Sequence, residues 1–188
     1  MTTTEAIVAT TTGLGGDHGP ATPASTRPAT VTTYWPAGAP AAVRWVRDPD
    51  DDHACVRTLL GLHDLAGGVV VCPAAPGSPW PVLARDLLLA LGKTREALDD
   101  AGPRSRLPGL LALWLRAEQI RHLVVLRAHR LPVATRAALA HLTAGAGVAL
   151  WAVDHTSTPT PHAMHWTAAA ALLGVARDTA RRPRPADS

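Results

Sequence analysis

The chain has 188 residues, of which 47% are hydrophobic and 4% aromatic, and its formal net charge is +3. This composition supports one domain with a hydrophobic core and excludes a wholly disordered chain. Two cysteines are too few for a disulfide framework, and the small basic excess is below that of a generic nucleic-acid-binding protein.

The N-terminal quarter of the chain divides into two segments of different composition. Residues 1–33 are rich in Thr, Ala, Gly and Pro, which predicts a disordered tail. Residues 34–50 carry Trp35 and Trp45 beside arginines and indicate an extended arm that packs on the domain. No apolar run is long enough to span a membrane and no secretory signal is visible, so we expect a cytoplasmic protein without membrane contact.

Strand-like and helical segments alternate through residues 51–180, which we interpret as the folded domain. Short apolar runs at 69–72, 123–126 and 148–153 are typical of strands buried on both faces. Helical patterns cover about 51–65, 81–91, 107–119, 133–143 and 162–177. The alternation predicts an α/β fold with a small parallel sheet of about three to four strands flanked by helices. Residues 181–188 form an Arg/Pro tail.

The segment after the first of these apolar runs has the outline of a phosphate-binding loop without its chemistry. Such a loop, G-x-x-x-x-G-K-S/T, uses backbone N–H groups, a Lys and a hydroxyl to hold phosphates and Mg²⁺. The matching positions here are Ala74, Pro79, Trp80 and Pro81, with Gly77 and Ser78 inside the loop. Proline has no N–H and tryptophan has no positive charge. The sequence therefore predicts a degenerate nucleotide site.

A second motif follows the next apolar run, where Ala128 to Leu131 reads Ala-His-Arg-Leu. This motif and the order of elements resemble P-loop NTPases of the AAA+ type, in particular the ATP-binding target-selection proteins of bacterial transposons. The resemblance implies an Asp that holds Mg²⁺ and a Glu that activates water at the positions of Leu126 and Arg127. Leu126 cannot bind a metal and Arg127 inverts the charge. The resemblance thus implies an AAA+-like domain with no catalytic residues, no metal and no cofactor.

These observations favour a non-catalytic AAA+-like protein, not an enzyme. It would act as a structural, adaptor or regulatory subunit through protein–protein contacts. A protein partner or a homo-oligomer is expected, and no small-molecule substrate is identified. Large aromatic and basic side chains are typical of contact sites. The candidate contact residues of this kind are Trp35, Trp45, Trp80, Arg177, Arg181 and Arg182.

Two other interpretations stay open. The alternative function is a nucleic-acid-binding accessory factor, with DNA as partner, that uses the Arg-rich tail and the Trp/Arg arm. A third interpretation is an enzyme with a site around Asp154, His155 and His162. His162 and His165 have a spacing that suits Zn²⁺, but no acidic or thiol partner lies at a recognisable distance, so no metal site is predicted.

Overall fold

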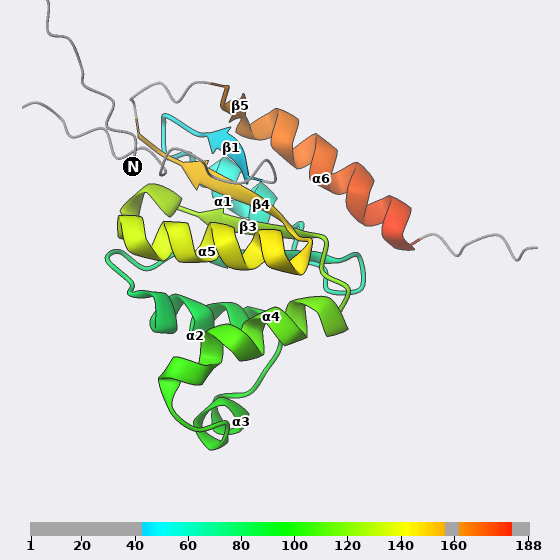
Figure 1. Ribbon diagram of the computed structural model, residues 1–188. Coiled ribbons are helices and arrows are strands. Elements are labelled where there is room, and N and C mark those ends of the chain that lie inside the picture. Colours follow the sequence, from blue (N-terminus) through cyan, green and yellow to red (C-terminus); the bar gives the residue numbers. More distant parts are fainter. Residues whose placement is uncertain (1–42, 157–161, 182–188) are drawn as a thin grey trace, which may run out of the picture. The chain divides into compact units, whose positions relative to one another are not determined.

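The computed structural model describes residues 43–156 and 162–181, which form one sheet covered by helices on both faces (Figure 1). The strands are β1 (Val43–Arg47), β2 (Val69–Pro73), β3 (His122–Leu126), β4 (Ala149–Asp154) and β5 (Met164–His165). All pair in parallel, in the order β2-β3-β4-β1-β5. The predicted α/β fold with a small parallel sheet is confirmed, although its five strands exceed the three to four expected.

Six α-helices and two short 3₁₀ turns lie within the described ranges. They are α1 (His53–Leu60), α2 (Trp80–Ala90), α3 (Arg95–Asp100), η1 (Arg104–Arg106), α4 (Leu107–Ala117), η2 (Ala128–Arg130), α5 (Val133–Ala146) and α6 (Trp166–Arg181). Two of the expected helices have different bounds, since α1 ends before residue 65 and α6 begins four residues after residue 162. None of these helices is long and apolar enough to cross a membrane.

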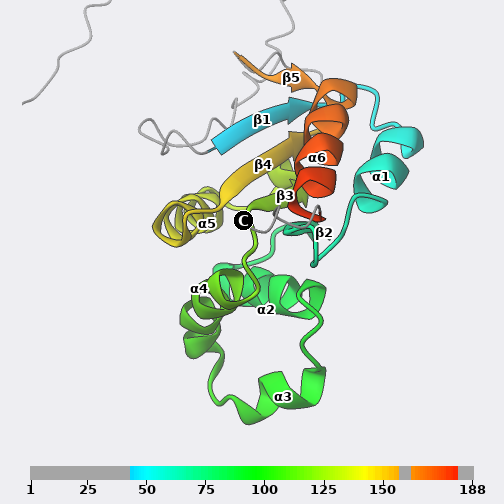
Figure 2. The same cartoon turned by 90° about the vertical axis from the view of Figure 1, so that its right-hand side faces the viewer.

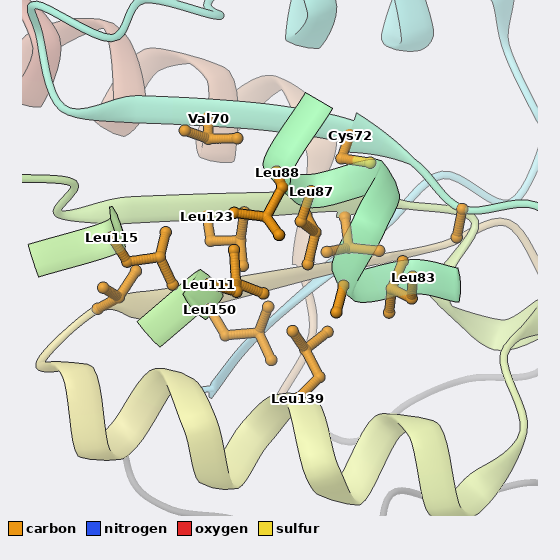
Figure 3. Close-up of a cluster of buried hydrophobic side chains, with 14 of the residues drawn as sticks. Val70, Cys72, Leu83, Leu87, Leu88, Leu111, Leu115, Leu123, Leu139 and Leu150 are labelled. Atoms are coloured by element: carbon orange, nitrogen blue, oxygen red, sulfur yellow. The ribbon is translucent and has the colours of Figure 1, made fainter. Parts of the chain in front are cut away.

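One face of the sheet is covered by α2, α4 and α5 (Figure 2). Leucines at helical spacing on these helices point towards the apolar side chains of the strands, and Figure 3 shows them meeting in one cluster. Its members include Val70, Leu83, Leu87, Leu111, Leu123, Leu139 and Leu150. Burial of each such side chain stabilises the fold by about 1.5–3 kcal/mol relative to exposure. A core without phenylalanine therefore depends on branched aliphatic packing.

The opposite face is covered by α1 and α6, which lie together on that side of the sheet in Figure 2. Each helix contributes a pair of buried residues four positions apart, the spacing that places side chains on one helical face. The pairs are Cys55 with Leu59, and Ala169 with Leu173. They pack against strand residues that include Trp151 at the centre of the sheet.

The expectation of an extended arm over residues 34–50 is wrong for residues 43–47. These residues form β1, an interior strand that pairs with β4 on one side and β5 on the other. Val46 is buried against α1 and α6, whereas Trp45 is half-buried and packs against the cluster on the other face. Trp45 thus takes part in core packing, and its role as a partner contact stays a prediction. Residues 1–42 and 182–188, with Trp35 and Arg182, lie outside the described residues.

Candidate functional site

The carboxyl ends of β1, β3 and β4 meet at one edge of the sheet. Open parallel sheets bind ligands at this edge, at the switch point where successive connections cover opposite faces. Here α1 follows β1 over one face, and α5 joins β3 to β4 over the other, so the switch point lies between the neighbouring strands β1 and β4. The polar residues gathered there form what we call the carboxyl-edge cluster: Asp48, Asp51, Arg127, His129, Asp154 and His155.

The centre of the carboxyl-edge cluster is a buried pair of Asp48 and His155. Both side chains are 1% exposed, and His155 Nδ1 lies 2.9 Å from Asp48 Oδ2. Because a carboxylate only accepts, Nδ1 carries the proton of this bond. Asp48 Oδ2 also accepts the N–H of Asp52 at 2.9 Å. The pair joins residues 107 positions apart in the chain and fixes the end of β1 to the end of β4.

Asp51 and Arg127 extend the network towards β3. Both adopt positive φ angles, 47° and 57°, and Arg127 Nη2 lies 3.3 Å from Asp51 Oδ1. Burial acts to raise the pKa of Asp51, but the hydrogen bond from Arg127 and the charges of His155 and Arg127 outweigh it, so this pKa lies below its usual value. Asp51 therefore stays ionised at neutral pH and holds the Arg127 guanidinium.

His129 completes the cluster beside Asp154. Its Nδ1 lies 3.5 Å from Asp154 Oδ1 and accepts the backbone N–H of His155 at 3.4 Å. Burial lowers the pKa of His129, and the opposing charge of Asp154 does not offset it. The imidazole is therefore neutral at pH 7, as its role as a hydrogen-bond acceptor requires.

Asp48, Asp51 and His155 are the described residues whose ligand atoms approach a metal-binding arrangement, all lying within 4.8 Å of one another. Arg127 already supplies positive charge to Asp51, and Asp48 already accepts two hydrogen bonds. The protein's own groups thus balance these carboxylates, and we assign no metal to them. Within the described ranges His162 and His165 belong to no such group, and His165 Nδ1 instead lies 2.9 Å from Thr167 Oγ1.

The loop between β1 and α1 occupies the position of an anion-binding turn. Free N–H groups at a helix N-terminus attract phosphates. In this loop, Asp52 Oδ1 accepts the N–H of Ala54 at 2.7 Å, and Asp48 accepts the N–H of Asp52. Carboxylates therefore sit where an anion would bind. The available sequence signal is the run of three aspartates, Asp50 to Asp52, between an apolar segment and a helix.

The degenerate loop predicted at residues 74–81 follows β2, which is the outermost strand on one side of the sheet. Its N–H groups are used within the protein: Ala74 donates to the Leu126 carbonyl, Gly77 to the Arg130 carbonyl and Ser78 to the Ala75 carbonyl. Ala74 and Ser78 are buried, while Leu126 belongs to the core beneath α1 and α6. Pro79 precedes α2 without a side-chain cap, and Pro81 occupies its first turn. The loop thus packs against η2 and α5 rather than presenting a cradle of donors.

The candidate contact residues are dispersed by the fold. Trp80 is half-buried and lines a groove with α4 and α5. Near the end of α6, Arg177 pairs with Asp178 at 3.0 Å and Arg181 pairs with Asp64 at 2.7 Å. The hydrogen bond from Arg181 is the main cause that lowers the pKa of Asp64. These two arginines therefore face acidic neighbours, which weakens them as contacts for a phosphate backbone.

Both cysteines are expected to be unreactive towards thiol reagents in the folded protein. Cys55 and Cys72 are buried, and burial is the main cause that raises the pKa of each thiol to about 12. Because the thiolate is the reactive form, a chromogenic disulfide reagent at pH 8 should detect no thiol before unfolding and two after it. Rapid reaction of either cysteine in the native protein would contradict this packing.

These features define an all-parallel α/β protein with an ion network at the carboxyl edge of its sheet. Comparison of the chain with protein-family models, curated proteins and solved structures found no match. Its function must therefore be inferred from the geometry of this edge and of the surfaces around it.

Proposed function

We propose that this chain is a non-catalytic, AAA+-like protein that acts as a structural, adaptor or regulatory subunit through contacts with other proteins. The observation that carries the proposal is that the hydrogen-bond donors at the switch point between β1 and β4 are already bonded to carboxylates. Carboxylates there accept the backbone N–H groups and side-chain donors that a nucleotide phosphate would need.

Electrostatics make this edge a poor site for a polyphosphate. Two like unit charges 4 Å apart repel by about 4 kcal/mol at an effective dielectric constant of about 20. A repulsion of that size weakens binding about a thousandfold. Asp48 and Asp51 lie beside the start of α1, and Arg127 is already paired with Asp51. A nucleotide would have to break these pairs as well as overcome the repulsion.

The AAA+ resemblance is retained in this proposal as a likeness of architecture without turnover. Two strand–loop–helix units, β1 to α1 and β2 to α2, have the outline of a phosphate-binding unit. The first carries aspartates. The second carries prolines, which have no N–H, and its Ala74, Gly77 and Ser78 N–H groups are bonded within the protein. Neither unit offers a Lys or a free donor cradle, which favours a role for the outer surfaces of the domain.

The test is a thermal-unfolding and phosphate-release experiment with ATP and Mg²⁺. A ligand present at about 100 times its Kd would stabilise the fold by about 2.7 kcal/mol, a shift of several degrees in Tm. We expect no shift and no Mg²⁺-dependent release of phosphate. ATP binding at micromolar Kd that is abolished in Arg127→Ala or Trp80→Ala would contradict the proposal. Arg57→Ala is the control, because Arg57 is exposed on α1.

A further inference from the structure

Helices α4 and α5 run side by side (Figures 1 and 2). Residues of both helices line a groove of about 400 Å³. It is separate from the carboxyl-edge cluster, with which it shares no residue. Trp80 from the start of α2 closes one part of the groove. The other residues that matter here are Gly109, Ala112, Arg116, His141 and Gly145.

The groove exists because the helices present small side chains to each other. Gly109 and Ala112 on α4 and Ala138 and Gly145 on α5 all line the groove. A Cβ atom added at Gly109 or Gly145 would meet no other atom within 4 Å. Glycine inside a helix costs roughly 0.5–1 kcal/mol relative to alanine. The hollow is thus maintained at some cost in helix stability.

The polar side chains of the groove are basic. Arg116 and His141 line it, and no carboxylate does so among the described residues. Arg116 donates a hydrogen bond to the Gly145 carbonyl near the end of α5, and it forms no ion pair within the described ranges. Its charge is therefore held at the groove with no acidic partner among the residues that the structure describes. This arrangement complements a ligand that carries a carboxylate.

The apolar parts of the groove have the composition of a protein contact site. Trp80 is half-buried, and Trp and Arg are the residue types enriched at binding hot spots. Leu113 is 63% exposed on α4, three and four positions from Arg116 and Gly109, so it extends the same face of the helix. A solvent-facing leucine beside a hollow between two helices suits the apolar side of an amphipathic segment.

We propose that the α4–α5 groove binds an amphipathic helical segment of a partner protein. Apolar side chains of that segment enter the hollow beside Trp80 and Leu113, and one of its Asp or Glu side chains pairs with Arg116. This inference rests on the proposed function, since it assigns the surface through which the non-catalytic domain contacts its partner.

The experiment is a selection of random 16-residue peptides displayed on phage against the full chain, followed by anisotropy measurements with the selected peptides. We expect the selected sequences to combine leucine-like residues at helical spacing with Asp or Glu. Arg116→Glu should weaken peptide binding at least tenfold, because it replaces the positive charge by a negative one. Gly109→Leu should also weaken peptide binding at least tenfold, because its side chain fills the groove. Arg57→Glu, on the opposite face of the sheet, should leave binding unchanged. Circular dichroism would verify that each variant folds.

Failure to select any peptide, a lack of acidic residues in those selected, or equal binding to Gly109→Leu would overturn the inference. A full chain that is dimeric by light scattering and becomes monomeric on Gly109→Leu would also overturn it, because the occupant would then be a second copy. The ATP test is independent of these results. If the chain binds both peptide and ATP, the proposed function is rejected and the groove inference stands. If the chain binds neither peptide nor ATP, the groove inference is rejected and the proposed function stands.

Discussion

Replacement of Asp48 by Ala is expected to lower the free energy of unfolding by about 3 kcal/mol. The Asp48 carboxylate is buried and accepts hydrogen bonds from His155 Nδ1 and the Asp52 N–H. Its removal leaves the buried His155 Nδ1–H and the Asp52 N–H without this acceptor, and a hydrogen-bonding group left unpaired on burial typically costs about 1–3 kcal/mol. Urea unfolding followed by circular dichroism would measure the change.

Asp50→Ala is the matched control, because Asp50 belongs to the same run of acidic residues but is exposed. We expect its effect to stay within about 0.5 kcal/mol. The double variant Asp48→Ala with His155→Ala should lose less than the sum of the single variants, since the two side chains interact directly. Equal stability of the Asp48 and Asp50 variants would show that the carboxyl-edge cluster does not hold β1 to β4.

The second large effect is expected at Trp151, for which substitution by Ala should cost about 4 kcal/mol. Trp151 is 2% exposed on β4, the middle strand of the sheet. Its Nε1 donates to His122 Nδ1 at 3.3 Å, and the Arg44 guanidinium lies 4.9 Å from the ring centroid. The variant loses this packing, the hydrogen bond and the cation–π contact, and it leaves a cavity beneath α1 and α6. Chemical unfolding of the variant beside the unaltered protein gives the measurement.

Trp166→Ala provides the comparison for this substitution. Trp166 begins α6 and is only half-buried against the same cluster. Because folding buries less apolar area at Trp166 than at Trp151, we expect the free energy of unfolding to fall by about 1.5 kcal/mol. Similar losses for the two variants would mean that the centre of the sheet is not the most tightly packed part of the domain.

Five of the six described α-helices and three of the strands were predictable because their signals are local, whereas α3 was not predicted. The runs at 69–72, 123–126 and 148–153 are uninterrupted apolar segments, and they became β2, β3 and β4. Strand β1 was missed because the segment Val-Arg-Trp-Val-Arg carries basic residues that hide its apolar positions. In the fold, Arg44 is exposed over Trp151, while Val46 turns to the core. Strand β5 has two residues and offers no pattern to detect.

The lack of phosphate-binding residue types at residues 74–81 was predictable from the sequence, but the ion network at the carboxyl edge was not. Once β1 is missed, β2 is taken for the first strand, although it lies at the edge of the sheet. The loop at the switch point is then sought after β2, whereas it follows β1. Only the strand order shows that Asp48 and Asp51 belong beside Arg127 and His155.

The sequence by itself determined the alternation of strands and helices and the absence of the Gly, Lys and Ser/Thr pattern of a phosphate-binding loop from residues 74–81, because both depend on residue type and on spacing within a few positions. Tertiary structure alone decided which charges meet at the carboxyl edge and where small residues leave a groove. Those features arise from parallel pairing and helix packing between segments up to about one hundred residues apart, such as Asp48 and His155, and no local pattern encodes such pairing.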